Sequence, residues 1–263
     1  MGFYMPEVTI KQLFDAGAHL GHRPRFWNPK FAPYLYGKHN GIHIINLDKT
    51  LPMLKEALRF ISDMVSKGGK ILFVGTKRAA SDSIEREANR CGMPYVHVHW
   101  LGGFLTNYKT VQNSIKEFNK LKVQIENNAF SGLNKKESRQ IQRKFEKSSR
   151  DFEGICNLTS PPDAMFVIDT AYEEIAIKEA RKLNIPIIAI VDTNNSAEGI
   201  DYPIPANDDA ISSIRLYTQL VADTVLEGIE KAEAAAAEEA ASPVLIKSDA
   251  VIVEQSTASV PSE

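Results

Sequence analysis

Three short apolar runs, residues 71–74, 164–168 and 187–191, constrain the fold of this chain more than any other feature. None of them alternates with polar residues, which is the pattern of strands buried on both faces. Helical patterns at 78–90 and 172–183 follow two of these runs. Strands that alternate with helices favour right-handed crossovers. We therefore predict an α/β fold, a Rossmann-like parallel sheet flanked by helices, with the three runs as its central strands.

Further elements are predicted around these strands. Residues 9–18 and 49–66 have helical periodicity, and residues 42–47 and 95–99 are typical of strands. Between the first helix and the first strand lies a loop at 19–40, which is rich in proline, glycine and aromatic residues. Its prolines are expected to keep it out of regular helix and sheet.

The alternation stops between residues 104 and 151, where two helical patterns each carry a narrow apolar stripe. This spacing predicts an antiparallel coiled-coil hairpin that packs mainly on itself and protrudes from the sheet domain. The segment contains eleven Lys and Arg against five Asp and Glu, a surplus of six positive charges. The Rossmann-like core is then discontinuous, with residues 1–103 and 152–228 on either side of the hairpin.

The last segment, residues 229–263, is acidic and rich in alanine and serine. Such a composition cannot build a core by itself, so we expect a frayed helix followed by a disordered tail. The only cysteines are Cys91 and Cys156, no secretory leader opens the chain, and no apolar run approaches the ~20 residues of a membrane span. These features indicate the cytosol.

An anion site is predicted where the strand at 71–74 breaks at Gly75. A strand that enters a helix through glycine leaves unpaired backbone N–H groups at the positive end of the helix dipole, and Lys77 and Arg78 add charge there. Neither a P-loop nor a dinucleotide glycine motif is present, so neither a triphosphate cradle nor a dinucleotide turn is predicted. A polynucleotide is one source of the expected phosphate. The alternative is a basic helical turn that is only solvated.

Two basic surfaces suit RNA. The loop at 19–40 mixes cations with flat rings, including Arg23, Arg25, Trp27 and Lys30, a composition that serves phosphate contact and base stacking. The hairpin carries its own cations, which can lie along a phosphate backbone. The candidate hairpin residues are Lys109, Lys135, Lys136, Arg139, Arg143 and Lys144. The alternatives are a loop anchored by its aromatic rings and a solvated hairpin whose lysines maintain solubility.

Metal binding is undecided from the sequence. His19 and His22 have helical spacing, but no cysteine or H-E-x-x-H context supports zinc. Asp192, Asp208 and Asp209 lie near predicted strand ends, where a cation bridged by a histidine is conceivable. Asp208 is also suited to cap the last helix. No catalytic triad, nucleophile elbow or carboxylate pair stands out, so we predict that the protein is not an enzyme.

Six ordered motifs across residues 8–228 together resemble the bacterial small-subunit ribosomal protein two family. They are IKQLFDAGAHLG at 10–21, WNPK at 27–30, HIINL at 43–47, GTKRAA at 75–80, WLGGFLTN at 100–107, and PDAMFVID at 162–169 with AIKEA at 176–180. The family commonly has arginine directly before the WLGG motif, where this chain has His99. Histidine is mostly neutral at pH 7, so an RNA contact is less expected at that point.

The resemblance implies a structural constituent of the small ribosomal subunit, with a Rossmann-like domain and an inserted coiled-coil hairpin. It implies binding to small-subunit ribosomal RNA near the junction of head and body, and docking of the messenger-binding ribosomal protein one. It implies neither cofactor nor catalytic residue, and neither membrane, small-molecule substrate nor obligate homo-oligomer. RNA-facing character carries over to the matching positions Arg23, Arg25, Trp27, Lys30, Lys77 and Arg78.

Two alternatives of other classes stay open. One is a Rossmann-like enzyme that binds a sugar phosphate or nucleotide at residues 75–78, with Asp169 or Asp192 at the switch point of the sheet. The other is an RNA-binding adaptor that never joins a ribosome. An enzyme should bind a small phosphate ligand stoichiometrically, whereas a ribosomal component should occur once per small subunit.

Overall fold

The structure is a computed structural model that describes residues 8–127 and 134–241. Its centre is a five-stranded sheet in the order β4-β3-β5-β6-β7, and every neighbouring pair is parallel. The strands are β3 (Ile71–Val74), β4 (Tyr95–Val96), β5 (Ala164–Ile168), β6 (Ile187–Val191) and β7 (Tyr202–Pro205). The predicted Rossmann-like class is confirmed, and the three apolar runs form the three central strands.

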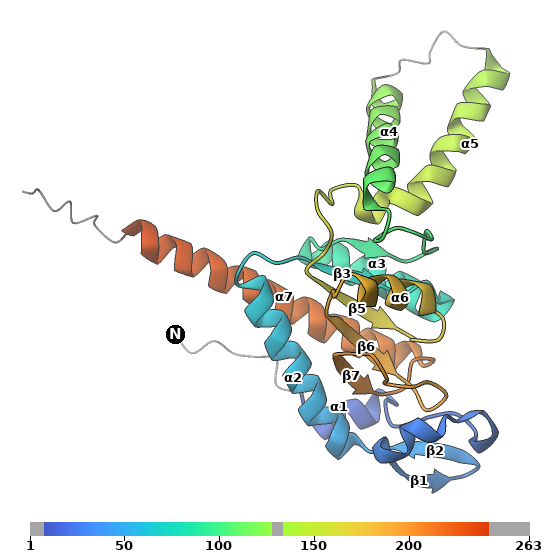
Figure 1. Cartoon of the computed structure of the whole chain (residues 1–263), viewed down its shortest axis with the longest axis vertical. Coiled ribbons are helices and arrows are strands. Elements are labelled where there is room, and N and C mark those ends of the chain that lie inside the picture. The colour runs from blue at the N-terminus through green and yellow to red at the C-terminus, as the bar shows by residue number, and fades with distance from the viewer. Residues whose placement is uncertain (1–7, 128–133, 242–263) are drawn as a thin grey trace, which may run out of the picture.

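Helices cover both faces of this sheet (Figure 1). On one face α2 (Leu47–Val65) and α3 (Arg78–Cys91) pack against α7 (Ile211–Ala241). On the other face lies α6 (Glu174–Lys182). Each face has its own hydrophobic core: the first includes side chains of α2, α3 and α7, and the second includes Ala176, Ile177 and Ala180 of α6. Because side chains alternate along a strand, β5 sends Phe166 to the first core and Met165 to the second.

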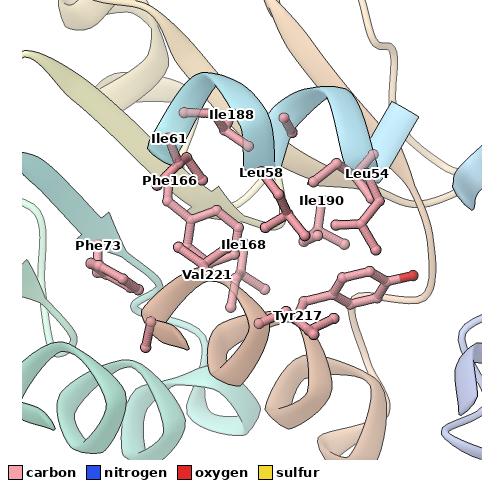
Figure 2. Close-up of a cluster of buried hydrophobic side chains, with 14 of the residues drawn as sticks. Leu54, Leu58, Ile61, Phe73, Phe166, Ile168, Ile188, Ile190, Tyr217 and Val221 are labelled. Carbon is pink, nitrogen blue, oxygen red and sulfur yellow. The ribbon is translucent and has the colours of Figure 1, made fainter. Parts of the chain in front are cut away.

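The first core is the larger of the two clusters. Figure 2 shows Tyr217 and Val221 of α7 beside Leu54 and Leu58 of α2, with Ile190 of β6 between the two leucines. All five are at most 3% exposed. This packing holds the sheet rigid, so the loops at the carboxyl ends of its strands have fixed starting points.

The N-terminal region differs from the prediction. After α1 (Ile10–Asp15) come two short 3-10 helices, η1 (Pro24–Phe26) and η2 (Pro29–Tyr34), and then β1 (Leu35–His39) pairs antiparallel with β2 (Ile42–Ile45). The expected irregular loop at 19–40 is therefore wrong over β1. Asn40 and Gly41 join the two strands with positive φ angles of 48° and 78°, as an Asn-Gly hairpin turn requires.

Two strand predictions also need correction. The run predicted at 42–47 ends earlier, because Asn46 caps α2 by accepting a hydrogen bond from the backbone N–H of Asp48. This strand, β2, belongs to the two-stranded sheet with β1 and not to the parallel sheet. The sheet instead gains β7, whose prolines Pro203 and Pro205 hid it from the prediction. Proline is tolerated in an edge strand, which is where β7 lies.

Two long helices, α4 (Tyr108–Glu126) and α5 (Lys135–Phe152), project from the sheet domain and diverge away from it (Figure 1). They contact each other through the Phe118 ring, whose centroid lies 5.7 Å from that of Phe145 and 6.2 Å from that of Phe152. These contacts use residues of the predicted apolar stripes. A coiled coil along the full length of the hairpin stays a prediction.

The chain returns from the hairpin through the 3-10 helix η3 (Glu153–Ile155), which packs against β4. Gly154 makes this possible, since a Cβ atom there would lie 2.2 Å from the Tyr95 carbonyl oxygen. The hairpin base is thus pressed directly onto one edge of the sheet.

At the other end of the chain α7 runs past the sheet to Ala241 (Figure 1). Residues 229–241 of the predicted tail are therefore helical. Residues 242–263, where disorder was predicted, lie outside the described residues. Within 8–127 and 134–241, no helix is both long and apolar enough to cross a membrane.

Candidate nucleic-acid interface

The N-terminal loop presents its cations to solvent. Arg23, Arg25 and Lys30 are exposed, and the Arg25 guanidinium lies 4.3 Å from the centroid of the Phe26 ring. Trp27 is half-buried, with its ring centroid 4.9 Å from that of His43. Arginine beside exposed rings suits phosphate contact and stacking. Lys30 is less free than Arg23 and Arg25, because its ammonium forms an ion pair with Glu198.

The predicted anion site at residues 75–78 already holds an internal anion. The backbone N–H and the hydroxyl of Thr76 both donate to Glu173 Oε1, each over 2.6 Å. Glu173 is 2% exposed, and burial raises its pKa although these hydrogen bonds oppose the shift. A buried carboxylate therefore takes the place expected for a polynucleotide phosphate at Thr76. Arg78, in the first turn of α3, remains exposed.

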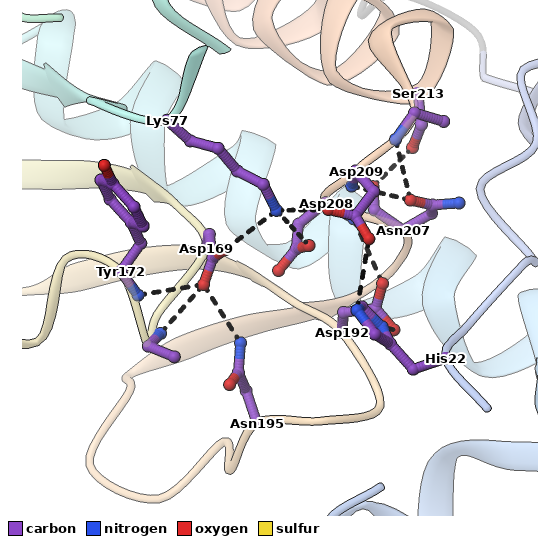
Figure 3. Close-up of polar contacts among 12 residues, drawn as sticks. His22, Lys77, Asp169, Tyr172, Asp192, Asn195, Asn207, Asp208, Asp209 and Ser213 are labelled. Carbon is purple, nitrogen blue, oxygen red and sulfur yellow. Dashed lines mark hydrogen bonds and ion pairs between the residues drawn. The ribbon is translucent and has the colours of Figure 1, made fainter. Parts of the chain in front are cut away.

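Lys77 also points into the protein. Its Nζ lies 3.0 Å from Asp169 Oδ2, 3.0 Å from Asp208 Oδ1 and 2.6 Å from Asp209 Oδ1 (Figure 3). Burial alone would lower the pKa of Lys77, but these carboxylates raise it above its ordinary value. A phosphate that approached Lys77 would have to compete with three carboxylates.

These partners belong to a group that we call the carboxylate cluster, formed by Asp169, Asp192, Asp208 and Asp209. Asp169 follows β5, Asp192 follows β6, and the other two follow β7, so all four lie at the carboxyl edge of the sheet, as predicted for the last three. Asp169 has a φ of 67°, and its Oδ1 accepts from the backbone N–H groups of Ala171 and Tyr172. Asp192 Oδ1 accepts from the Thr193 hydroxyl over 2.9 Å.

Asp208 is the cluster member that has an unpartnered oxygen within the described part of the chain. It is fully buried, and its Oδ2 has no hydrogen-bond partner among the described residues. Burial raises the pKa of Asp208 to about 7, with further contributions from the charges of Asp169 and Asp192. Asp208, expected as a cap of the last helix, instead pairs with Lys77 through Oδ1. The turn before α7 is held by Asn207, whose Oδ1 accepts from the backbone N–H groups of Asp209 and Ala210.

His22 joins the N-terminal loop to this cluster. Its Nδ1 lies 3.3 Å from Asp192 Oδ1 and its Nε2 lies 3.2 Å from Asp209 Oδ2 (Figure 3). The hydrogen bond with Asp192 raises the pKa of His22, burial opposes the shift, and the charges of Asp192, Asp209 and Asp208 add to it. His19 takes no part, because its ring stacks on Phe14 with centroids 4.2 Å apart. The structure thus brings a histidine together with the strand-end carboxylates that were considered as cation ligands. It does not bring His19 and His22 together as a pair of ligands.

A second buried charge, which sequence reasoning did not find, organises the loop before the hairpin. Glu179 on α6 accepts hydrogen bonds from the Trp100 indole and from the backbone N–H groups of Gly103, Leu105 and Thr106, over 2.7 to 3.2 Å. The Thr106 hydroxyl adds a fifth. We call this arrangement the Glu179 anchor. Burial would raise the pKa of Glu179, but the hydrogen bonds outweigh it and lower the pKa.

The hairpin presents its cations outward. Lys109, Lys136, Arg139, Arg143 and Lys144 are all exposed, and no ion pair within the described part of the chain engages them. Lys136, Arg139 and Arg143 line one hollow on α5, whereas Lys144 lies in the groove between α4 and α5. The side chain of Lys135 lies outside the described residues. One face of α5 therefore carries a row of three uncompensated cations.

Comparison with known proteins agrees with this architecture. A family model described as ribosomal protein S2 matches residues 13–228, which covers both halves of the sheet domain and the hairpin between them. The small ribosomal subunit protein uS2 of Dichelobacter nodosus (strain VCS1703A) is 52% identical over 233 residues, which cover 89% of this chain and 86% of that protein. The chain therefore belongs to the ribosomal protein S2 family and is a structural constituent of the small ribosomal subunit.

Proposed function

We propose that this protein binds small-subunit ribosomal RNA, near the junction of head and body, through its hairpin and its N-terminal loop. The observation that carries the proposal is the row formed by Lys136, Arg139 and Arg143. These residues recur every three or four positions, so they share one face of α5, and no described carboxylate neutralises them. A projecting helix with such a face can follow a phosphate backbone.

The N-terminal loop supplies a second contact of different chemistry. Arg23 and Arg25 are exposed cations, and Phe26 is 52% exposed beside Arg25. An exposed ring next to a guanidinium offers both a stacking platform and a phosphate contact, which suits unpaired nucleotides. We assign smaller roles to Lys30 and Trp27, because Lys30 is paired with Glu198 and Trp27 is half-buried against His43.

Among the matched motif residues at the start of α3, we retain Arg78 as an RNA contact and give Lys77 a structural role. Arg78 is exposed, whereas Lys77 is held by three carboxylates. The same arrangement argues against the enzyme alternative. A sugar phosphate at residues 75–78 would face Glu173 and the carboxylate cluster, and like charges at close range repel.

The test is the salt dependence of RNA binding. The logarithm of the affinity should fall linearly with the logarithm of salt concentration, with a slope of about −0.7 to −0.9 per neutralised phosphate. Replacing Lys136, Arg139 and Arg143 with alanine should reduce the magnitude of the slope by about 2 to 3, measured by filter binding to ribosomal RNA. A triple variant of Lys55, Arg59 and Lys67, which are exposed on or just after α2, removes the same charge elsewhere.

Equal slopes for the α5 variant and the wild type would remove α5 from the RNA interface. Equal losses in the α5 variant and the α2 control would show a general effect of net charge. Either result would leave the loop contacts to be tested separately with Arg23→Ala and Arg25→Ala.

We also propose that the protein helps to dock ribosomal protein one. Support comes from Ile10 and Phe14, one turn apart on α1 and 42% and 57% exposed, since exposed apolar residues on one helix face favour a protein contact. The Phe14→Ser variant should weaken co-sedimentation of purified ribosomal protein one with this chain. Val123→Ser on α4, where Val123 is 53% exposed, is the matched control.

A further inference from the structure

We propose that His22, Asp192 and Asp209 bind a divalent transition-metal cation of the Zn²⁺ type, which staples the N-terminal loop to the carboxyl edge of the sheet. Each residue offers one ligand atom, and the three atoms lie within 4.8 Å of one another. The three residues come from separate parts of the chain, before β1, after β6 and after β7. A cation at this point would therefore join segments that the sequence keeps far apart.

The donor chemistry favours a cation of borderline softness. Imidazole nitrogen is a preferred ligand of Zn²⁺ and its neighbours, whereas Mg²⁺ prefers an all-oxygen set. Zinc bonds to nitrogen and carboxylate oxygen are roughly 2.0 to 2.2 Å long, so adjacent ligands in a tetrahedral site lie roughly 3.3 to 3.6 Å apart. The two carboxylates now contact different ring nitrogens, since Asp192 Oδ1 lies 3.3 Å from His22 Nδ1 and Asp209 Oδ2 lies 3.2 Å from Nε2. A single cation can bind only one of these nitrogens, so the imidazole must turn when the cation binds, over a site whose three ligand atoms already lie within 4.8 Å of one another.

An independent observation is the unpartnered oxygen of Asp208. This side chain is fully buried within the same cluster, and its Oδ2 has no hydrogen-bond partner among the described residues. Asp208 adjoins Asp209 in the chain, and its backbone N–H lies 3.5 Å from Asp192 Oδ2. A buried, unsatisfied carboxylate directly beside two others is costly unless a positive charge compensates it. Lys77 reaches only the other oxygen, Oδ1.

The backbone around His22 is built for close approach to the sheet. A Cβ atom at Gly21 would lie 2.5 Å from Thr193 Cγ2, so only glycine fits. The backbone N–H of His22 donates to Thr193 Oγ1 over 2.8 Å, and that of Asn28 donates to the Thr193 carbonyl over 2.7 Å. The ligands are thereby held in position by contacts that do not involve their own side chains, which is how preorganised metal sites are supported.

The competing explanation is that a protonated His22 bridges the two aspartates without a metal. The two explanations differ in their response to added metal. The full-length protein, freed of metal with a chelator that is then removed, would be titrated with Zn²⁺ by calorimetry and melted with and without Zn²⁺. We expect one equivalent to bind, and at about 100 times the dissociation constant the Tm should rise by about 5 to 10 °C.

Two variants locate the site. Asp209→Asn and His22→Gln should each weaken Zn²⁺ binding at least tenfold and abolish the Tm shift. Asp209 is suited to this test because its side chain is 55% exposed, so the variant is expected to fold. Asp82→Asn is the matched control, since Asp82 is exposed on α3 and distant from the cluster in sequence.

Spectra with Co²⁺ in place of Zn²⁺ give a readout that does not depend on stability. Visible absorption that saturates at one equivalent, and that is lost in Asp209→Asn, would support the site. The proposal is overturned if the folded wild type neither binds Zn²⁺ nor shows a Tm shift. It is also overturned if both variants bind Zn²⁺ as tightly as the wild type, or if Mg²⁺ binds and Zn²⁺ does not.

Discussion

The Glu179 anchor and the carboxylate cluster bury negative charge in opposite ways. Glu179 stands alone and receives five hydrogen bonds, all from the loop at 100–107 and three of them from backbone N–H groups. The cluster gathers four aspartates around Lys77 and His22 and leaves one oxygen of Asp208 unpartnered. The charge of Glu179 is fully hydrogen-bonded by groups of the loop, whereas the cluster has more negative charge than its own cations offset.

The difference is visible in the two buried carboxyl groups. The pKa of Glu179 is lowered despite its burial, whereas the pKa of Asp208 is raised to about 7. Fixed backbone donors stabilise a charge without adding mobile groups, so the anchor can serve as a rigid support for the start of α4. Clustered carboxylates repel one another, so the cluster depends on cations.

The largest effect should come from removing the charge of the anchor. Glu179→Gln replaces an acceptor of five hydrogen bonds by an amide whose NH₂ group faces other donors. We expect the free energy of unfolding in urea to fall by about 3 to 5 kcal/mol, because buried donors lose their partners. Glu174→Gln, an exposed residue of the same helix that pairs with Lys178, should change it by less than about 0.5 kcal/mol. A loss as small as that of the control would show that the loop holds itself without Glu179.

A somewhat smaller loss is expected when the cluster loses its main cation. Lys77→Met keeps most of the length of the side chain but removes a charge shared by three aspartates. We expect the free energy of unfolding to fall by about 2 to 3 kcal/mol, discounted because Lys77 is partly exposed. Arg78→Met, one residue later and exposed, is the control. If RNA affinity fell and stability did not, Lys77 would be an RNA contact after all.

Acid should weaken the anchor in a defined direction. Because the pKa of Glu179 in the folded protein lies below the ordinary value of 4.5, its contribution to stability is complete above about pH 4.5. That contribution is lost as the pH falls through the lowered pKa of the folded state. The difference in urea midpoint between the wild type and Glu179→Gln should therefore shrink below pH 4. A difference independent of pH would show that the amide disturbs the loop by its shape rather than by its missing charge.

The smallest effect should come from Asp208→Asn. The substitution keeps the shape of the side chain and removes a charge that no partner satisfies at Oδ2. In protein freed of metal we expect stability to stay within about 1 kcal/mol of the wild type, because the lost pairing with Lys77 is offset by reduced repulsion. Urea unfolding of both proteins gives the answer. A loss comparable to that of Glu179→Gln would end the contrast between the two regions.

The sequence was sufficient for the centre of the fold and insufficient for its borders. Residues 71–74, 164–168 and 187–191 were recognisable because buried strands are continuously apolar. β7 was missed because Pro203 and Pro205 are typical of loops, and β1 because three prolines just before it suggested an irregular segment. The Asn40–Gly41 pair is a hairpin signal that the prediction did not use.

The site was predictable by residue type and not by partner. Lys77 was identified as a cation at a helix start, but its carboxylate partners lie 92 to 132 residues away, and no local pattern joins them. Glu179 and the loop at 100–107 both stood in recognised motifs. Their contact spans 73 to 79 residues, so the motifs could not reveal that one carboxylate satisfies that loop. The structure shows that Arg23, Arg25, Arg78 and the described cations of α5 are exposed, and their contact with RNA stays a prediction.

The two edges of the sheet also affect how the protein behaves before it joins the small ribosomal subunit. An unpaired strand edge is a template on which another copy can polymerise. At β4 the outer edge is covered by η3, pressed close by Gly154. At β7 the backbone N–H of Ala206 donates to the Val191 carbonyl oxygen, on the side of β6. Backbone N–H groups of alternate residues in a strand point to the same side, so positions 203 and 205 have their backbone nitrogens on the outer side. Both positions are proline, which has no N–H group to offer another strand. A further strand therefore cannot pair readily with either edge, which protects a newly made chain from aggregation before it is assembled into the subunit.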